Sequence, residues 1–127
     1  MSTIKEQIGE YLASEGLRPQ EEDYGFYFRY QMLNFFIRWD EDDAHFLQIT
    51  LPSIFDVDEN NRGDVLEAAN HVNSTRKVVK CIVLGESVWL MTEQLLDTDP
   101  IFVDVIPRSL DMLLHAREAF YEGLREI

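Results

Sequence analysis

The sequence predicts an α+β fold on an antiparallel sheet, with the element order α-β-β-β-α-β-β-α. Apolar residues recur at helical spacing near both ends and in the middle of the chain, and they alternate with a period of two in between. Turn-forming or acidic residues separate these segments. The 127 residues, 46% of them hydrophobic, have the size and composition of a single domain spanning residues 1–127.

The first predicted element is an amphipathic helix. Thr3 and Glu6 have the spacing of a capping box, and Gly16 offers a C-terminal stop. A polar loop over residues 18–23 follows. The apolar positions that define the helical face are Ile4, Ile8, Tyr11 and Leu12.

Three strands are predicted next, at residues 24–30, 34–39 and 44–51. Aromatic and β-branched residues alternate through them. Four adjacent acidic residues at 40–43 favour a turn, because like charges repel inside a regular element. Pro52 is expected to end the third strand, since proline cannot donate a ladder hydrogen bond.

The second half of the sequence predicts a helix, a β-hairpin and a C-terminal helix. A helical stripe begins near Asn61, which suits an N-cap, and strands follow at residues 77–84 and 87–93 around a Gly85-Glu86 turn. No element is assigned between Leu95 and Val105. The final helix places Pro107 in its first turn. Its apolar positions are Ile106, Leu110, Leu113, Leu114, Ala119, Phe120 and Leu124.

The charge of the chain disfavours several classes of partner. The formal net charge is -13, from 24 acidic and 11 basic residues, and no dense basic stripe offsets it. Phosphate backbones and anionic membrane surfaces would be repelled, and no apolar run is long enough to span a bilayer. We therefore expect neither nucleic acid nor a membrane as partner.

The N-terminus and the cysteine content favour the cytoplasm. The first residues lack the apolar core of a secretion signal. Cys81 is the only cysteine, so no internal disulfide is possible, and its apolar neighbours predict an inert buried thiol. No phosphate-binding loop, dinucleotide fingerprint or nucleophile elbow occurs, so no cofactor and no enzymatic activity are predicted.

One segment carries a family resemblance. Residues 68–80, Ala-Ala-Asn-His-Val-Asn-Ser-Thr-Arg-Lys-Val-Val-Lys, resemble the Asn-x-x-Asn passage of the YbjN family, which runs into a strand of small and β-branched residues. The element order from Tyr24 onward is similar to that family and to the type III secretion chaperone-like fold. The resemblance implies helices packed on one side of the sheet, no known catalytic centre, a homodimer, and a chaperone-like or regulatory role. The acidic stretch between Asp40 and Asp64 departs from the pattern.

The acidic loop 56–67 resembles a calcium-binding loop in its spacing. Oxygen-bearing residues occupy positions one, three, five, nine and twelve of such a loop. Position six, where the sharp turn favours glycine, is Asn61, and a strand with proline rather than a helix precedes the loop. The alternative is a solvated loop whose carboxylates favour the start of the next helix through its dipole.

The three histidines predict no zinc site. His45, His71 and His115 lie on three different predicted elements, and none has the spacing of a paired ligand. Carboxylate pairs are frequent in so acidic a chain and therefore say little about acid and base catalysis. A small hydrolase remains a third hypothesis on this ground alone.

The most informative feature is apolar character in both phases of the strands. A sheet covered by helices on one face leaves the other face polar when alternation is clean. Here the second phase contains aromatic, methionine and arginine side chains, the types enriched where proteins bind one another. The alternatives are an exposed interface and helices that wrap both faces; whether Trp89 or Val88 points inward also stays open. The candidate protein-binding residues are Tyr27, Arg29, Phe36, Arg38, Trp89 and Met91.

The leading hypothesis is therefore a non-enzymatic protein-binding module that acts as a chaperone-like protein or regulatory adaptor. We expect a homodimer whose sheet face or edge recognises itself and an extended polypeptide, through strand addition and aromatic pockets. The alternative is a regulatory domain that responds to calcium or a small ligand at the acidic loop 56–67.

Overall fold

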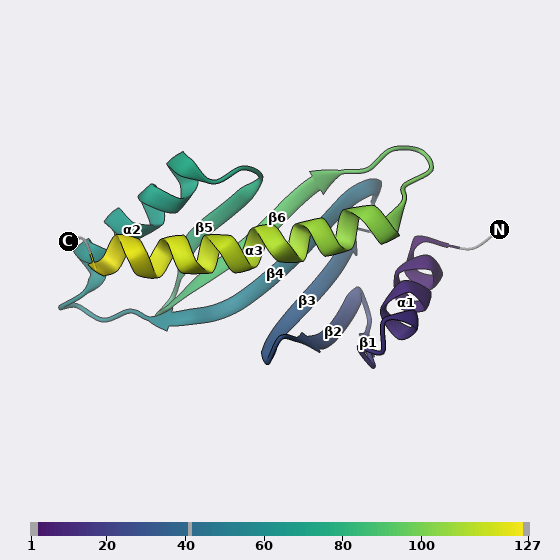
Figure 1. The fold of residues 1–127 in the computed structure, drawn as a ribbon, viewed down its shortest axis with the longest axis horizontal. Helices are drawn as coiled ribbons and strands as arrows, with labels where there is room; N and C mark the ends of the chain where they lie inside the picture. The colour runs from purple at the N-terminus through teal and green to yellow at the C-terminus, as the bar shows by residue number, and fades with distance from the viewer. Residues whose placement is uncertain (1–2, 41, 126–127) are drawn as a thin grey trace.

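The computed structural model describes residues 3–40 and 42–125. The predicted order of helices and strands is confirmed, and a short sixth strand is added near the N-terminus (Figure 1). The elements are α1 (Ile4–Ser14), β1 (Gln20–Glu22), β2 (Gly25–Tyr30), β3 (Leu33–Asp40), β4 (Asp43–Asp56), α2 (Arg62–Thr75), β5 (Val79–Leu84), β6 (Ser87–Leu95) and α3 (Phe102–Arg125).

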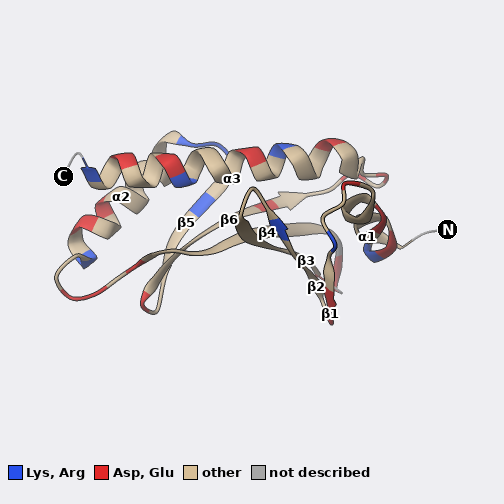
Figure 2. Cartoon of the chain, turned by 60° about the horizontal axis from the view of Figure 1, so that its bottom comes forward, with Lys and Arg blue, Asp and Glu red and all other residues tan. Residues whose placement is uncertain are grey.

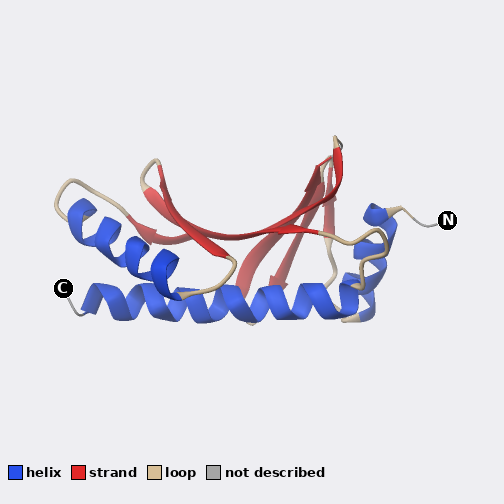
Figure 3. Cartoon of the chain, turned by 90° about the horizontal axis from the view of Figure 1, so that it is seen from above, coloured by secondary structure: helices blue, strands red, loops and turns tan. Residues whose placement is uncertain are grey.

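The six strands form one antiparallel sheet in the order β1-β2-β3-β4-β6-β5. All three helices lie on the same side of it, as the resemblance implied, and α3 runs along most of its length (Figure 3). Both ends of the sheet bend away from α3, so the uncovered side is concave (Figure 3). We call this uncovered side the open face. Across the described residues, no helix is long and apolar enough to cross a membrane.

Helix α1 begins and ends as predicted. The hydroxyl of Thr3 accepts a hydrogen bond from the backbone N–H of Glu6 at 3.1 Å, which satisfies one of the free donors of the first turn. At the other end Gly16 has a φ of +72°, and the N–H groups of Gly16 and Leu17 return to Ala13 and Leu12. This pair of bonds is the Schellman motif, and it directs the chain out of the helix at Leu17.

Two strand predictions were incomplete. The segment predicted as the loop 18–23 contains β1, which pairs with β2 through Gln20↔Tyr27. Strand β4 does not end before Pro52 but continues to Asp56 after a change of register between Leu51 and Phe55. A bulge can accommodate a proline because its residues leave the hydrogen-bonded ladder, and Ser53 takes a positive φ of 54° there.

The starts of the two later helices also differ from prediction. The side chain of Asn61 forms no cap; instead the carboxylate of Asp58 accepts the N–H groups of Asn60 and Asn61, at 2.8 and 2.9 Å. Helix α3 begins at Phe102, so Pro107 lies inside the helix and not in its first turn. Apolar spacing identified the body of α3 correctly but missed its first turns, where only Phe102 is buried among residues 101–104.

The core lies between the sheet and the helices. Phe35 on β3 and Phe120 on α3 are the largest fully buried side chains, and Phe120 meets Phe55 of β4 edge to face at 5.7 Å. Gly123 brings α3 close to α2, because a Cβ at this position would lie 3.4 Å from Ala68. The apolar residues of one strand phase therefore pack against the helices, and the residues that alternate with them form the open face.

Candidate protein-binding site

The strand register places all six predicted site residues on the open face. Direct partners share a face, and the pairs Tyr27↔Phe36, Phe36↔Thr50 and Thr50↔Met91 form one row across four strands. Arg29, Arg38 and Trp89 each lie two residues from a member of this row, so they share its face. The question left open by the sequence is thus answered: Val88 is buried toward the helices, and Trp89 is on the other side.

An aromatic pair dominates the part of the open face on β2 and β3. The rings of Tyr27 and Phe36 lie 4.4 Å apart between centroids, and Tyr27 is 46% exposed. The ring of Phe36 covers Gly25, where a Cβ would lie 2.6 Å from it and 2.2 Å from the carbonyl oxygen of Ile37. Glycine is therefore needed at this position for Phe36 to lie flat on the sheet.

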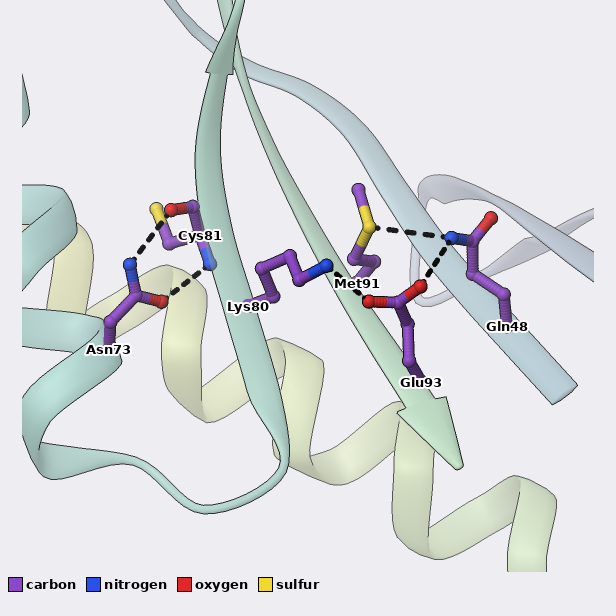
Figure 4. Close-up of polar contacts among 6 residues, drawn as sticks. All are labelled: Gln48, Asn73, Lys80, Cys81, Met91 and Glu93. Atoms are coloured by element: carbon purple, nitrogen blue, oxygen red, sulfur yellow. Dashed lines mark hydrogen bonds and ion pairs between the residues drawn. The ribbon is translucent and has the colours of Figure 1, made fainter. Parts of the chain in front are cut away.

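The part on β4, β6 and β5 is more closed. Met91 is only 8% exposed although it lies on the open face, and the side chain of Gln48 contacts its sulfur. The amide of Gln48 donates to the sulfur of Met91 at 3.5 Å and to the carboxylate of Glu93 at 3.3 Å, and Glu93 forms an ion pair with Lys80 (Figure 4). These polar contacts link three strands and leave Met91 little free surface.

Trp89 is half-buried on the same side of β6. Its indole N–H donates to the hydroxyl of Ser87 at 2.9 Å, so the polar atom of the ring is satisfied within the chain. Of the six predicted residues, Tyr27, Arg29 and Arg38 are the exposed ones, while Phe36 and Trp89 are half-buried. The accessible part of the candidate site is therefore centred on β2 and β3.

The open face carries charges of both signs. Its basic side chains are Arg29, Arg38 and Lys80, and its acidic ones include Glu22, which pairs with Gly25, and Glu93, which forms an ion pair with Lys80. Acidic and basic bands both occur on the helices and in the sheet (Figure 2). Within residues 3–40 and 42–125, neither Arg29 nor Arg38 has an ion-pair partner. The aromatic pair is thus flanked by two guanidinium groups without an ion pair, and Glu22 and Asp23 line a hollow with Tyr27, Phe36 and Arg38.

The edges of the sheet are poorly suited to strand addition. On the β5 edge, the side chain of Asn73 accepts the N–H of Cys81 at 2.7 Å and donates to its C=O at 2.9 Å, as a neighbouring strand would (Figure 4). The opposite edge, β1, has three residues and two carboxylates, from Glu21 and Glu22. Short, charged edges discourage pairing with another chain. The geometry therefore favours the face over the edge.

Cys81 is buried, as predicted. Loss of hydration in this setting raises the pKa of its thiol to about 12, so the nucleophilic thiolate is scarce at neutral pH. His45, His71 and His115 lie on β4, α2 and α3. In the part of the chain that is described, no three His, Cys, Asp or Glu side chains gather where a metal ion could bind.

Polar groups of the acidic loop 56–67 form hydrogen bonds with one another. Besides the bonds to Asp58, the side chain of Asn61 accepts the N–H of Asp58 at 2.8 Å and donates to the C=O of Asp56 at 3.1 Å. Glu67 is exposed on α2. These contacts organise the start of α2, and the calcium alternative gains no support from them.

A hollow beside Tyr27 was not predicted. It has a volume of about 350 Å³ and lies where β1, β2 and the segment after α1 meet. Alternation could not reveal it, because three of its seven lining residues come from the segment after α1 and from β1, and that strand was predicted as loop. Its lining residues are Leu17, Arg18, Gln20, Tyr27, Phe28, Arg29 and Asn34.

A six-stranded antiparallel sheet with every helix on one side and aromatic side chains on the open face defines a two-layer α+β protein. The YbjN family, described as "Putative bacterial sensory transduction regulator", matches residues 5–126, and the chain belongs to this family. The predicted resemblance to YbjN is confirmed. The description is that of a regulator, consistent with the regulatory part of the predicted role.

Solved structures share the fold. An uncharacterized protein from Methanothermobacter thermautotrophicus is 14% identical, with a TM-score of 0.71 and 96% of each chain covered. A second structure, "YbjN, a putative transcription regulator from E. coli", is 9% identical, with a TM-score of 0.66, covering 94% of this chain and 90% of that one. At these identities the likeness shows the fold alone. No match was found among curated proteins.

Proposed function

We propose that this chain is a non-enzymatic regulatory adaptor that binds a polypeptide on the open face of its sheet. One observation carries the proposal. The six aromatic, methionine and arginine residues singled out from the sequence share a face that no helix covers. In an ordinary two-layer protein this face would be polar, since water is its only neighbour.

The side chains on this face match those enriched in protein interfaces. Tyr27 offers a large, rigid contact area, and the neighbouring arginines can bind carboxylates or main-chain carbonyls of a partner. The sheet curves around its uncovered side, so side chains from several strands can contact the same bound segment. Binding on the face, and not by strand addition, is supported by the side chain of Asn73, which occupies the β5 edge at Cys81, and by the short β1 edge.

A non-enzymatic role is supported by the state of the one cysteine. Burial of Cys81 and the resulting pKa of about 12 make it a poor nucleophile. The family description, that of a regulator, points the same way. We further propose that the chain acts as one domain in the cytoplasm, where its single buried thiol would stay reduced. We propose that it binds neither nucleic acid nor membranes, because its formal net charge is -13.

Photo-crosslinking tests the proposed site. A benzoylphenylalanine at position 27 is expected to capture a specific protein in the native host, while the same group at the exposed Glu118 on α3 should not. The double variant Tyr27→Ser, Trp89→Ser should reduce capture by a crosslinker placed at position 36. Equal capture from positions 27 and 118, or no effect of the double variant, would contradict the proposal.

We also propose that the chain forms a homodimer through this face. Dimers with a buried interface persist at moderate salt, because apolar contacts are not screened. The expected result is a dimer mass by light scattering at high micromolar concentration, and a shift toward monomer in the variant Tyr27→Ser, Trp89→Ser. A monomer under all these conditions would refute the dimer without bearing on binding of another protein.

A further inference from the structure

The hollow beside Tyr27 has a composition unusual for so acidic a chain. Arg18 and Arg29 both line it, and no carboxylate from the described residues does. Neither guanidinium has an ion-pair partner within the ranges that the structure describes, although the chain has more than two acidic residues for each basic one. Two arginines without an ion pair at one hollow have the chemistry to bind an anion.

The other residues that line the hollow indicate which chemical group the bound anion carries. Leu17, Tyr27 and Phe28 supply apolar and aromatic surface, while Gln20 and Asn34 supply amide groups that can donate hydrogen bonds. A volume of about 350 Å³ is near the lower end for ligand pockets, so the hollow suits a small ligand with about one ring. A purely inorganic anion would leave this apolar surface unused.

The end of α1 places Arg18 at the hollow, and a hydrogen bond orients the side chain of Arg29. The Schellman motif at Gly16 ends α1 and directs Leu17 back toward Leu12, and Arg18 then takes a positive φ of 48°. The guanidinium of Arg29 donates a hydrogen bond to the C=O of Met32 at 3.2 Å. The remaining donors of its guanidinium are available to a ligand.

We propose that this hollow binds a carboxylate attached to an aromatic or aliphatic group. A carboxylate accepts paired hydrogen bonds from a guanidinium, and its single charge is repelled less by the acidic chain than a polyphosphate would be. The carboxylate comes either from a free organic acid or from the C-terminal residue of a peptide. The inference does not depend on the proposed polypeptide binding, but Tyr27 belongs to both sites, so a bound acid would affect the open face.

Titration with matched ligands tests the chemistry. Phenylacetate is expected to shift the amide NMR signals of residues 17–34 in a saturable way. Phenylacetamide, of the same shape but neutral, should bind about tenfold more weakly or worse, because charge-assisted hydrogen bonds are lost. N-acetyl-Gly-Phe and its C-terminal amide form the second pair and distinguish a peptide source from a free acid. Equal binding of the charged and neutral members of both pairs, or no saturation at millimolar concentration, would overturn the inference.

Two variants and a control locate the site. Arg18→Gly removes one guanidinium where a positive φ suits glycine, and Arg29→Lys keeps the charge but loses the planar pair of donors. Each should weaken phenylacetate binding about tenfold. Arg62→Gln makes the same change in net charge as Arg18→Gly at an exposed position on α2 and should leave binding unchanged. The site is wrong if Arg62→Gln weakens binding as much as Arg18→Gly, or if neither hollow variant weakens it.

Discussion

Replacing Asn73 tests how the β5 edge of the sheet is held. Its side chain makes two hydrogen bonds to the backbone of one residue, Cys81, and so ties α2 to β5. In Asn73→Ala both bonds are lost, and water must satisfy the N–H and C=O of Cys81 on a partly buried edge. The same residue lies in the segment 68–80 from which the family resemblance was drawn.

The expected loss of stability follows from these two bonds. At about 1 kcal/mol each they contribute about 2 kcal/mol. Alanine is the better helix former by about 0.5 kcal/mol, so Asn73→Ala should lose about 1.5 kcal/mol overall, or roughly 5 °C in Tm. Asn70→Ala is the matched control, because Asn70 is exposed on the same helix and has the same gain in propensity.

The assay is urea unfolding of both variants, combined with hydrogen exchange. The difference in unfolding free energy between Asn73→Ala and Asn70→Ala should be about 2 kcal/mol, and the amide of Cys81 should exchange faster only in the first. If the two variants are equally stable and Cys81 keeps its protection, then Asn73 does not hold the edge. A large loss in Asn70→Ala would show instead that the helix itself is sensitive.

Three further predictions concern the sheet and the core. Gly25→Ala should lose about 3 kcal/mol in urea unfolding, since its Cβ would meet the backbone of Ile37 at 2.2 Å; an unchanged midpoint would contradict this. Phe120→Ala should lose about 3–5 kcal/mol in the same assay, because Phe120 is fully buried against Phe55; a loss below that of Asn73→Ala would be inconsistent. The thiol of Cys81 has a pKa of about 12 in the folded protein and an ordinary pKa, near 9.0, in the unfolded chain. Above pH 9 the unfolded chain therefore loses this proton first, and the free energy of unfolding falls by up to about 1.4 kcal/mol per pH unit toward pH 12; below pH 9 the thiol causes no such fall. Cys81→Ala should therefore flatten the fall of Tm across this range, and parallel curves for both proteins would refute it.

Most of the fold was predictable because its elements have clear periods. The alternation through Tyr24–Tyr30 and the Gly85 turn identified strands whose two faces have different neighbours. The strand β1 could not be found this way, because all three of its residues are exposed and it carries no apolar alternation. The continuation of β4 past Pro52 was missed because proline usually ends a strand. Here the proline is tolerated because it lies at a bulge.

The candidate site was predictable in part for a related reason. Strand phase alone groups Tyr27 with Arg29 and Phe36 with Arg38, so their residue types could be read from the sequence. Whether they meet depends on the register between strands, which arises from turns and core packing. The closure of Met91 by Gln48, and the part taken by Arg18 in the hollow, could not be inferred from spacing.

Local patterns were thus sufficient for the order of the elements, the acidic character of the chain and the family, because each of these depends on residues close together in sequence. The position of the helices on one side, the concave open face and the blocked β5 edge depend on contacts between distant segments. Asn73 illustrates the difference: as a residue it is one polar position on a helix, and its partner Cys81 is set by how α2 packs against β5. Distant elements pack so that both the exposed apolar area and the number of unpaired backbone groups are small. This packing determines which surfaces stay exposed and can bind a partner.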